Sequence, residues 1–155
     1  MVTQVIDNFL NKEETKFLIN YYNSNESKTF VFGNTNPLNI SLKDENLKFL
    51  INKLNISAKK INNSQLDWLQ IVKWKVSKGQ DLHFDTASNQ TTLSSILYLN
   101  DDFEGGETYY EDGTLFSPVT GRILYFDGNY YKHGVKPITK GTRYTIATWY
   151  KKNAY

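Results

Sequence analysis

The second half of this chain is a succession of short strand-like segments, and this pattern limits the possible folds more than any other feature. From about Leu66 onward, the segments are rich in β-branched and aromatic residues and are bounded by Gly, Pro, Asn or Asp, which is typical of β-strands. They are LDWLQIVKWKV, TTLSSILYLN, ETYYE, GRILYFDG, HGVKPI and TRYTIATWYK. Several short strands at close spacing predict a sandwich, a barrel or a jelly roll.

The residues that precede these strands are predicted to be helical. Asn11 is suited to cap a helix, because Glu14 stands in the capping-box position and Leu10 can act as a hydrophobic staple. Aromatic and aliphatic residues then recur at helical spacing, at Phe17, Leu18, Tyr21 and Tyr22. A second helix is expected over residues 44–60. Two N-terminal helices packed on a β-sheet body make an α+β domain.

Length and composition narrow the class of protein. The 155 residues suit one compact domain, with residues 1–65 as mostly helical support and 66–150 as the β core. A net charge of +2 is too weak to indicate nucleic-acid binding. The absence of cysteine excludes disulfides, thiolate zinc sites and cysteine nucleophiles. Because we find neither a signal peptide nor an apolar run of the roughly 20 residues that span a membrane, we expect a cytoplasmic protein without membrane contact.

The only two histidines of the chain are candidates for a metal site with one aspartate. His83 and Asp85 are two residues apart, so in an extended segment their side chains project to the same face. His133 stands at the start of a later strand-like segment. Two imidazoles and one carboxylate on neighbouring strands suit non-haem Fe(II), and zinc can also use three such ligands together with water. The residue types alone do not separate the two metals.

Arg143 suggests that a carboxylate ligand binds beside this metal. It lies ten residues after His133, so a hairpin formed by VKPI and TRYTIA would return it to the neighbourhood of the metal. Alternation along the strand divides the residues into two faces: Arg143, Thr145, Ala147 and Trp149 on one, and Tyr144, Ile146, Thr148 and Tyr150 on the other. A guanidinium beside a hydroxyl can bind a carboxylate in a bidentate manner.

In this order, the segments resemble those of the Fe(II)/2-oxoglutarate-dependent dioxygenases, and within them the prolyl-4-hydroxylase-like branch. The matching text is LQIVKWKVSKGQDLHFD, TTLSSILYLNDDFEGGETYY and HGVKPITKGTRYTIATWY, with a looser match of VIDNFLNKEETKFLI to the first helix. The resemblance covers about residues 66–150. It implies a double-stranded β-helix, which is a type of jelly roll, supported by N-terminal helices.

The resemblance also implies the roles of individual residues. His83, Asp85 and His133 would ligate Fe(II), and no catalytic group beyond this metal centre is expected. The cosubstrates would be 2-oxoglutarate and O2, with ascorbate as a reductant. The 5-carboxylate of 2-oxoglutarate would be bound by Arg143, Tyr98 and Thr145. The candidates for the wall of the substrate pocket are Trp149, Trp74, Tyr109 and Tyr131.

Two positions depart from patterns within this family. Trp74 stands where many prolyl-4-hydroxylase-like enzymes have a tyrosine, which leaves the substrate less certain than the chemistry. Arg143 stands where the collagen-type enzymes use lysine. Since the chain holds only two arginines against 16 lysines, we interpret Arg143 as a requirement for bidentate geometry.

Three functions are compatible with these residues. The first is hydroxylation of a prolyl residue in a peptide or protein, and the second is the same chemistry on a free amino acid or other small molecule. The third is a metal-binding jelly roll without turnover, which would have no need for Arg143. Nucleic-acid demethylation is disfavoured, because the relatives that perform it carry a second arginine where this chain has Trp149.

The segment between the two helices bears on the choice between a peptide and a small molecule. Residues 23–40, which are polar and turn-rich except for Phe30, Val31 and Phe32, are predicted to form a loop with one short strand. If the substrate is a peptide, this loop is expected to act as a lid over it. The oligomeric state is left open by the sequence.

Overall fold

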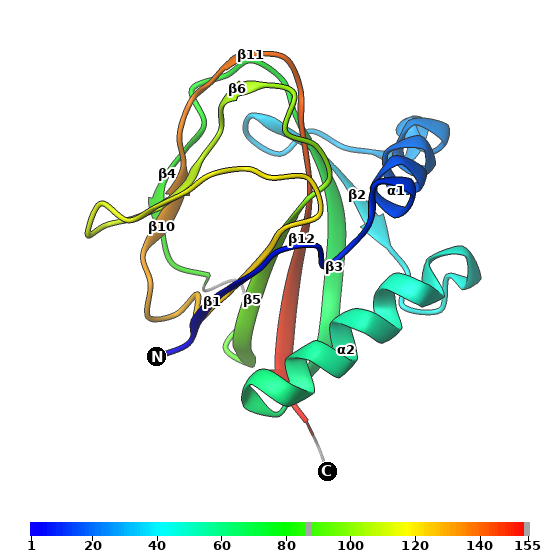
Figure 1. Ribbon diagram of the computed structural model, residues 1–155, viewed down its shortest axis with the longest axis vertical. Helices are drawn as coiled ribbons and strands as arrows, with labels where there is room; N and C mark the ends of the chain where they lie inside the picture. The colour runs from blue at the N-terminus through cyan, green and yellow to red at the C-terminus, as the bar shows by residue number, and fades with distance from the viewer. Residues whose placement is uncertain (86–87, 154–155) are drawn as a thin grey trace.

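Two layers of antiparallel β-sheet face each other in the computed structural model, which describes residues 1–85 and 88–153 (Figure 1). The larger sheet has the strand order β1-β9-β5-β12-β3-β2. Its strands are β1 (Thr3–Ile6), β9 (Ile123–Phe126), β5 (Thr91–Tyr98), β12 (Arg143–Lys152), β3 (Ser64–Trp74) and β2 (Thr35–Ile40). Both helices lie on the outer side of this sheet (Figure 1).

The opposite layer consists of two smaller sheets. The four-stranded one has the order β4-β10-β7-β8, with β4 (Gln80–His83), β10 (His133–Val135), β7 (Thr108–Tyr110) and β8 (Leu115–Phe116). The two-stranded one pairs β11 (Ile138–Lys140) with β6 (Glu104–Gly105). Antiparallel sheets with two supporting helices confirm the α+β class and are consistent with a jelly roll.

The first helix has the N-terminus that the sequence predicts. Helix α1 spans Lys12–Ser24, and the Asn11 side chain accepts a hydrogen bond of 2.8 Å from the Glu14 backbone. The Glu14 carboxylate accepts one of 3.0 Å from the Asn11 backbone N–H. The capping box is therefore complete, and it satisfies two backbone donors that a helix end leaves without partners.

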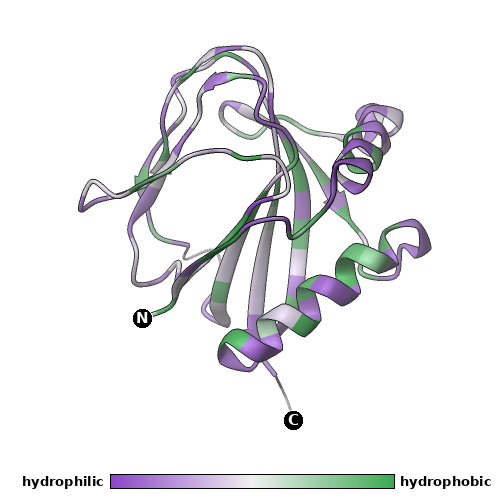
Figure 2. Ribbon diagram, viewed as in Figure 1, coloured by the Kyte–Doolittle hydropathy of each residue, from purple (hydrophilic) through white to green (hydrophobic). Residues whose placement is uncertain are grey.

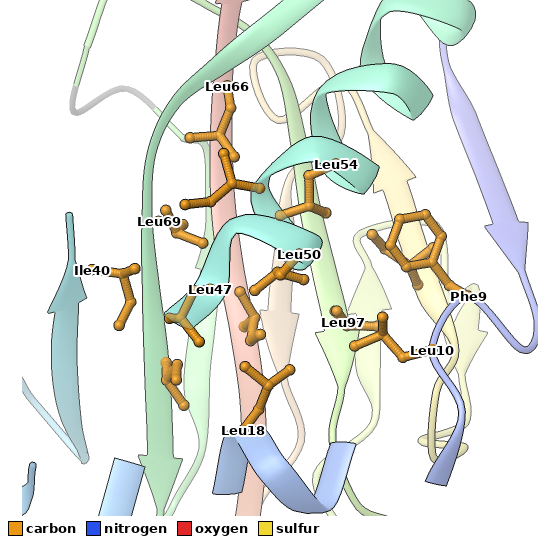
Figure 3. Packing of buried hydrophobic residues seen from close by; sticks show 14 of the residues in the cluster. Phe9, Leu10, Leu18, Ile40, Leu47, Leu50, Leu54, Leu66, Leu69 and Leu97 are labelled. Carbon is orange, nitrogen blue, oxygen red and sulfur yellow. The ribbon is translucent and has the colours of Figure 1, made fainter. Parts of the chain in front are cut away.

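The second helix supplies most of the apolar contact with the large sheet. A short 3-10 turn, η2 (Glu45–Leu47), leads into α2 (Lys48–Asn62), close to the expected range. Figure 3 shows Leu50 and Leu54 of α2 packing toward Leu69 of β3 and Leu97 of β5. Hydrophobic and hydrophilic residues alternate in bands along this helix (Figure 2), as expected for a helix with one buried face. Among the described residues, no helix combines the length and the apolar character that crossing a membrane requires.

The prediction of mostly helical support over residues 1–65 is incomplete. Strands β1 and β2 come from this region and form the two edges of the large sheet. The short strand expected within residues 23–40 is confirmed as β2 at Thr35–Ile40, preceded by the 3-10 turn η1 (Glu26–Lys28). This strand contains Pro37. Proline lacks an N–H, and it is tolerated here because β2 pairs only with β3.

The hairpin expected from VKPI and TRYTIA does not form. Strand β11 pairs with β6, while β12 lies between β5 and β3, so both edges of β12 are already paired. The alternation predicted along β12 is nevertheless confirmed. Ile146 and Tyr150 belong to the core under the helices, and the residues that face away from this core are Arg143, Thr145, Ala147 and Trp149.

Replacing the capping residue tests the local stability of this arrangement. We expect Asn11→Ala to lower the free energy of unfolding by about 1 kcal/mol, because it removes the acceptor for the Glu14 N–H. Denaturant unfolding followed by circular dichroism measures the loss. The control is Asn20→Ala at an exposed position within α1, where alanine has the higher helix propensity. An equal loss in both variants would contradict the role of the cap.

Candidate active site

The two histidines and the aspartate converge at one point. His83 ends β4 and His133 begins β10, and the two residues are Cα partners in the antiparallel pair. Their ring centroids are 4.5 Å apart. Asp85 Oδ1 lies 3.2 Å from His133 Nε2 and 3.7 Å from His83 Nε2. One donor atom from each residue lies within 4.8 Å of the others, a cluster that could hold a metal ion.

Backbone carbonyls fix the orientation of both imidazoles. His83 Nδ1 lies 2.8 Å from the Asp81 carbonyl oxygen, and His133 Nδ1 lies 2.8 Å from the Tyr131 carbonyl oxygen. A carbonyl oxygen only accepts, so each Nδ1 carries the proton and donates it. The Nε2 atoms are thereby left to face the Asp85 carboxylate. This is the tautomer in which Nε2 binds a metal, so the donor set fits a divalent cation.

The Asp85 carboxylate is buried and oriented by its neighbours. Its Oδ2 accepts a hydrogen bond of 2.7 Å from Ser94 Oγ. This bond orients the carboxylate so that Oδ1 points toward the histidines. Burial acts to raise the pKa of Asp85, but the hydrogen bond and charge of His133, with help from Ser94, outweigh it and lower that pKa. The carboxylate is thus ionised at neutral pH, which is the form that binds metals.

Gly128 and Ser94 belong to this site although the sequence analysis did not single them out. The Gly128 carbonyl accepts a hydrogen bond of 2.9 Å from the Asp85 N–H. A Cβ at Gly128 would lie 2.6 Å from Asp85 Oδ2 and 2.7 Å from Ser94 Oγ, so only glycine fits there. The sequence offered one signal for this role, the Asp127-Gly128 pair directly after the strand-like run ILYF. A glycine at such a position can mark a place where another chain segment approaches closely, as well as a turn.

The three residues line a cavity of about 460 Å³ between the sheets. Arg143 and Thr145 of β12 are in the same wall, as are Trp74 and Trp149. The site-facing residues of β12 therefore meet the histidines of the small sheet across one cavity. Apolar side chains complete much of the wall, among them Val72, Ile96, Phe126, Val135 and Ala147.

Arg143 is a buried cation beside this cavity. Arg143 is only 1% exposed, and its Nε donates a hydrogen bond of 2.9 Å to the Gly106 carbonyl. Among the described residues, no carboxylate oxygen lies within 4.0 Å of the guanidinium. Burial lowers the pKa of Arg143, and neighbouring Tyr98 acts in the opposite direction. Because a buried charge is stabilised by a partner of opposite charge, this position suits the carboxylate of a ligand.

Tyr98 lies next to Arg143 and is the Cα partner of Thr145, but it is not among the residues that line the cavity. The centre of the guanidinium is 5.5 Å from the Tyr98 ring centroid and 5.2 Å from that of Trp74. The Tyr98 hydroxyl shares a short hydrogen bond with Thr108 Oγ1, which in turn lies 3.5 Å from Arg143 Nη2. Thr108 and Gly106, both in the GGET segment, are thus further neighbours of Arg143 that the sequence analysis missed.

Two of the aromatic residues predicted to form the pocket wall lie elsewhere. Tyr109 and Tyr131 are not part of the cavity lining. Lys136 Nζ lies 4.1 Å from the Tyr109 ring centroid. The Tyr131 ring stacks on Tyr110 at 4.6 Å, and its hydroxyl donates to the Met1 carbonyl at 3.3 Å. Tyr131 thus joins the apolar cluster of Tyr110, Leu124 and Phe126, whereas Trp74 and Trp149 face the cavity.

A cluster of two histidines and one carboxylate with open coordination positions is typical of non-haem Fe(II) oxygenases. The family model of the 2OG-Fe(II) oxygenase superfamily matches residues 69–151. This match covers more than half of the chain, and the chain belongs to this superfamily of oxygenases. The family resemblance identified from the sequence motifs is thereby confirmed.

Individual relatives match over different lengths. Human prolyl 3-hydroxylase 2 is 41% identical over 64 residues, which are 37% of this chain and 9% of the human protein. The chain thus spans about a tenth of the length of this curated relative.

Two solved structures share the fold. The viral collagen prolyl hydroxylase of Paramecium Bursaria Chlorella virus-1, in its 2OG complex, gives a TM-score of 0.79 at 19% identity, with 98% of this chain and 96% of that chain covered. The prolyl hydroxylase of Trichoplax adhaerens, solved with a peptide of hypoxia inducible factor, gives 0.77 at 21% identity, covering 97% and 83%.

The close approach at Gly128 can be tested through metal affinity. We expect Gly128→Ala to weaken Mn(II) binding about tenfold or more, because the new Cβ must displace the Asp85 carboxylate or Ser94. Isothermal titration calorimetry measures the affinity. Gly113→Ala is the matched control, since a Cβ added at Gly113 would meet nothing within 4 Å. Its positive φ makes that substitution a strained one as well, so equal weakening in both variants would show that general destabilisation is the cause.

Proposed function

We propose that this chain is an Fe(II)/2-oxoglutarate-dependent dioxygenase that hydroxylates a prolyl residue in a peptide or protein. We further propose that residues 1–155 form one domain with a double-stranded β-helix at its core. One observation carries the proposal: the histidine–aspartate cluster and the buried, carboxylate-free Arg143 line the same cavity.

In this proposal His83, Asp85 and His133 hold the iron. Each histidine keeps its Nδ1 proton on a backbone carbonyl, so its Nε2 lone pair is available without further rearrangement. Ser94 holds the far oxygen of Asp85, which leaves the near oxygen for the metal. Three protein ligands leave the remaining coordination positions for other molecules.

Arg143 and Thr145 would hold the 5-carboxylate of 2-oxoglutarate. Arg143 is buried, and the hydrogen bond from its Nε to the Gly106 carbonyl holds the guanidinium in place. When bound, Fe(II) would allow O2 to place one oxygen atom on a C–H bond and the other in succinate, as 2-oxoglutarate gives up two electrons and releases CO2. Ascorbate would only return oxidised iron to Fe(II). The apolar wall keeps water away from this chemistry.

A peptide substrate is favoured by the rim of the cavity. The turn Phe32–Thr35, closed by two backbone hydrogen bonds of 3.0 Å, contributes Phe32 to the cavity lining. Phe32 is 65% exposed and its neighbour Val31 is 77% exposed. Exposed apolar side chains at a cavity rim are typical of a surface that contacts a partner chain. The names of the relatives, which are prolyl hydroxylases, support the prolyl residue as the target.

The same turn is suited to act as a lid. It projects from the end of β2 and is tied to the facing turn by one side-chain hydrogen bond, from Asn34 Nδ2 to the Gly79 carbonyl at 2.7 Å. Breaking one such bond costs about 1 kcal/mol. We propose that the turn opens to admit the peptide and closes over it.

The decisive experiment is reconstitution with Fe(II) and 2-oxoglutarate, followed by mass spectrometry of proline-containing peptides and of free amino acids. We expect a gain of one oxygen on a prolyl residue, with one succinate formed per hydroxylation. A gain of oxygen only on a free amino acid would reject the peptide substrate. An absence of succinate under all conditions would reject the oxygenase.

Arg143→Lys tests the cosubstrate position. A lysine keeps the charge but loses the planar fork that binds a carboxylate in a bidentate manner. We expect the apparent Kd for 2-oxoglutarate to rise by about tenfold or more, while Mn(II) affinity stays unchanged in calorimetry. Arg122→Lys is the control, because this other arginine pairs with Asp7 at the surface. Equal weakening of metal and cosubstrate binding in R143K would indicate misfolding and count against the assignment.

The lid is tested by replacing the two exposed apolar residues at its start, Val31 and Phe32, with polar ones. In the double variant Val31→Ser, Phe32→Ser, we expect the KM for the peptide to rise several-fold, because apolar contact with the bound chain is lost. Succinate formation without peptide should continue at the wild-type rate. Leu115→Ser changes an exposed apolar residue on β8 and should leave both quantities unchanged. An unaltered peptide KM in the double variant would refute the lid.

A further inference from the structure

A pair of stacked indoles stands at the edge of the candidate site. Trp149 of β12 lines the cavity, whereas Trp68 of β3 does not. The two residues are direct Cα partners, so their side chains lie on the same face of the large sheet. Their ring centroids are 3.8 Å apart and their planes differ by 13°. One face of the Trp149 indole is therefore covered by Trp68.

The other neighbour of Trp149 connects it to the candidate metal ligands. Its Cα partner on β5 is Ser94, whose hydroxyl donates to Asp85. Asp85, Ser94, Trp149 and Trp68 thus follow one another across the floor of the site. Trp68 covers one face of the Trp149 indole, so only its other face and its edges are available to the cavity that Trp149 lines beside Ser94.

A β-bulge next to Trp68 separates it from Leu66, while Trp68 itself continues the regular pairing of β3 with β12 on the site face. The pairing shifts from Trp149–Trp68 to Tyr150–Leu66, which leaves Asp67 as an extra residue on β3. In a regular strand, residues two positions apart share a face, so Leu66 would lie on the same face as Trp68. With the extra residue, Leu66 turns into the core under the helices while Trp68 faces the site. Bulges of this kind commonly re-aim a side chain next to an active site.

We infer that Trp68 is a positioning residue. By stacking on one face of the Trp149 indole, it holds that indole in a single orientation, so that the other face of Trp149 receives the ring of the prolyl substrate. This inference rests on the proposed function. A partly exposed tryptophan on a cavity wall has several rotamers available, and stacking against a second indole selects one. The face of an indole is electron-rich, so it attracts the polarised C–H groups of a pyrrolidine ring. Trp68 thereby favours substrates that offer a ring over those with an open side chain.

The orientation of Trp149 can be measured without substrate. In protein labelled with 5-fluorotryptophan, we expect one sharp fluorine resonance for Trp149. Trp68→Leu should broaden or split this resonance, whereas Trp68→Phe, which keeps a stacking ring, should retain a single line. A Trp149 resonance that stays single and unshifted in W68L would overturn the inference.

The consequence for substrate is measured by a double-mutant cycle. We expect W68L to raise the KM for the prolyl peptide by about threefold to tenfold, the range that corresponds to a lost aromatic contact, and W68F to restore most of it. In a Trp149→Leu background, W68L should have no further effect, because Trp68 acts through Trp149. An equal effect of W68L with and without Trp149 would show a merely structural role and reject the inference.

A control separates this effect from the general loss of an aromatic pair. Phe17 on α1 packs edge-on against Phe49 on α2, with ring centroids 6.0 Å apart and far from the site along the chain. Phe17→Leu should leave both the fluorine spectrum of Trp149 and the peptide KM unchanged. If the wild-type protein hydroxylates no prolyl peptide, the proposed function fails, while the fluorine spectra still decide whether Trp68 positions Trp149.

Discussion

The burial of the Arg143 guanidinium is the constraint on which the arrangement of the site depends. A cation removed from water needs hydrogen-bond acceptors and a counter-charge. The Gly106 carbonyl provides an acceptor, and the aromatic rings of Trp74 and Tyr98 provide polarisable faces. The described chain provides no carboxylate within salt-bridge distance. In the proposed function a ligand carboxylate supplies this counter-charge, and the same cavity is lined by the histidine–aspartate cluster.

The large sheet keeps this polar site apart from the apolar core. Along β12, alternate side chains enter the leucine-rich layer beneath α1 and α2 or the cavity on the opposite face. Two demands that would conflict in one layer, dense apolar packing and a pocket lined by charged side chains, are thus met by the two faces of one sheet. The bulge at Asp67 shows where this division needs adjustment, because it turns Leu66 into the core while Trp68 stays on the face of the site.

Much of this could be predicted from the sequence, because the relevant signals are local or strongly patterned. The capping box at Asn11 and the alternation along β12 depend only on neighbouring residues. The positions of β2 and of Tyr131 depend on tertiary context instead. Strand β2 contains Pro37, which reads as a loop unless the strand is known to be an edge. Tyr131 is one of many aromatic residues, and only the fold decides that it stacks on Tyr110.

The residues that the sequence failed to reveal share a physical property. Gly128, Ser94 and Thr108 act on a candidate ligand through a contact made by another chain segment. A glycine that must stay small because a carboxylate lies 2.6 Å from its would-be Cβ looks the same in sequence as a glycine in a turn. The histidines and Arg143 could be identified as candidate site residues because histidine and arginine are rare in this chain. The groups that orient them are common residue types, and their role follows from distance rather than from identity.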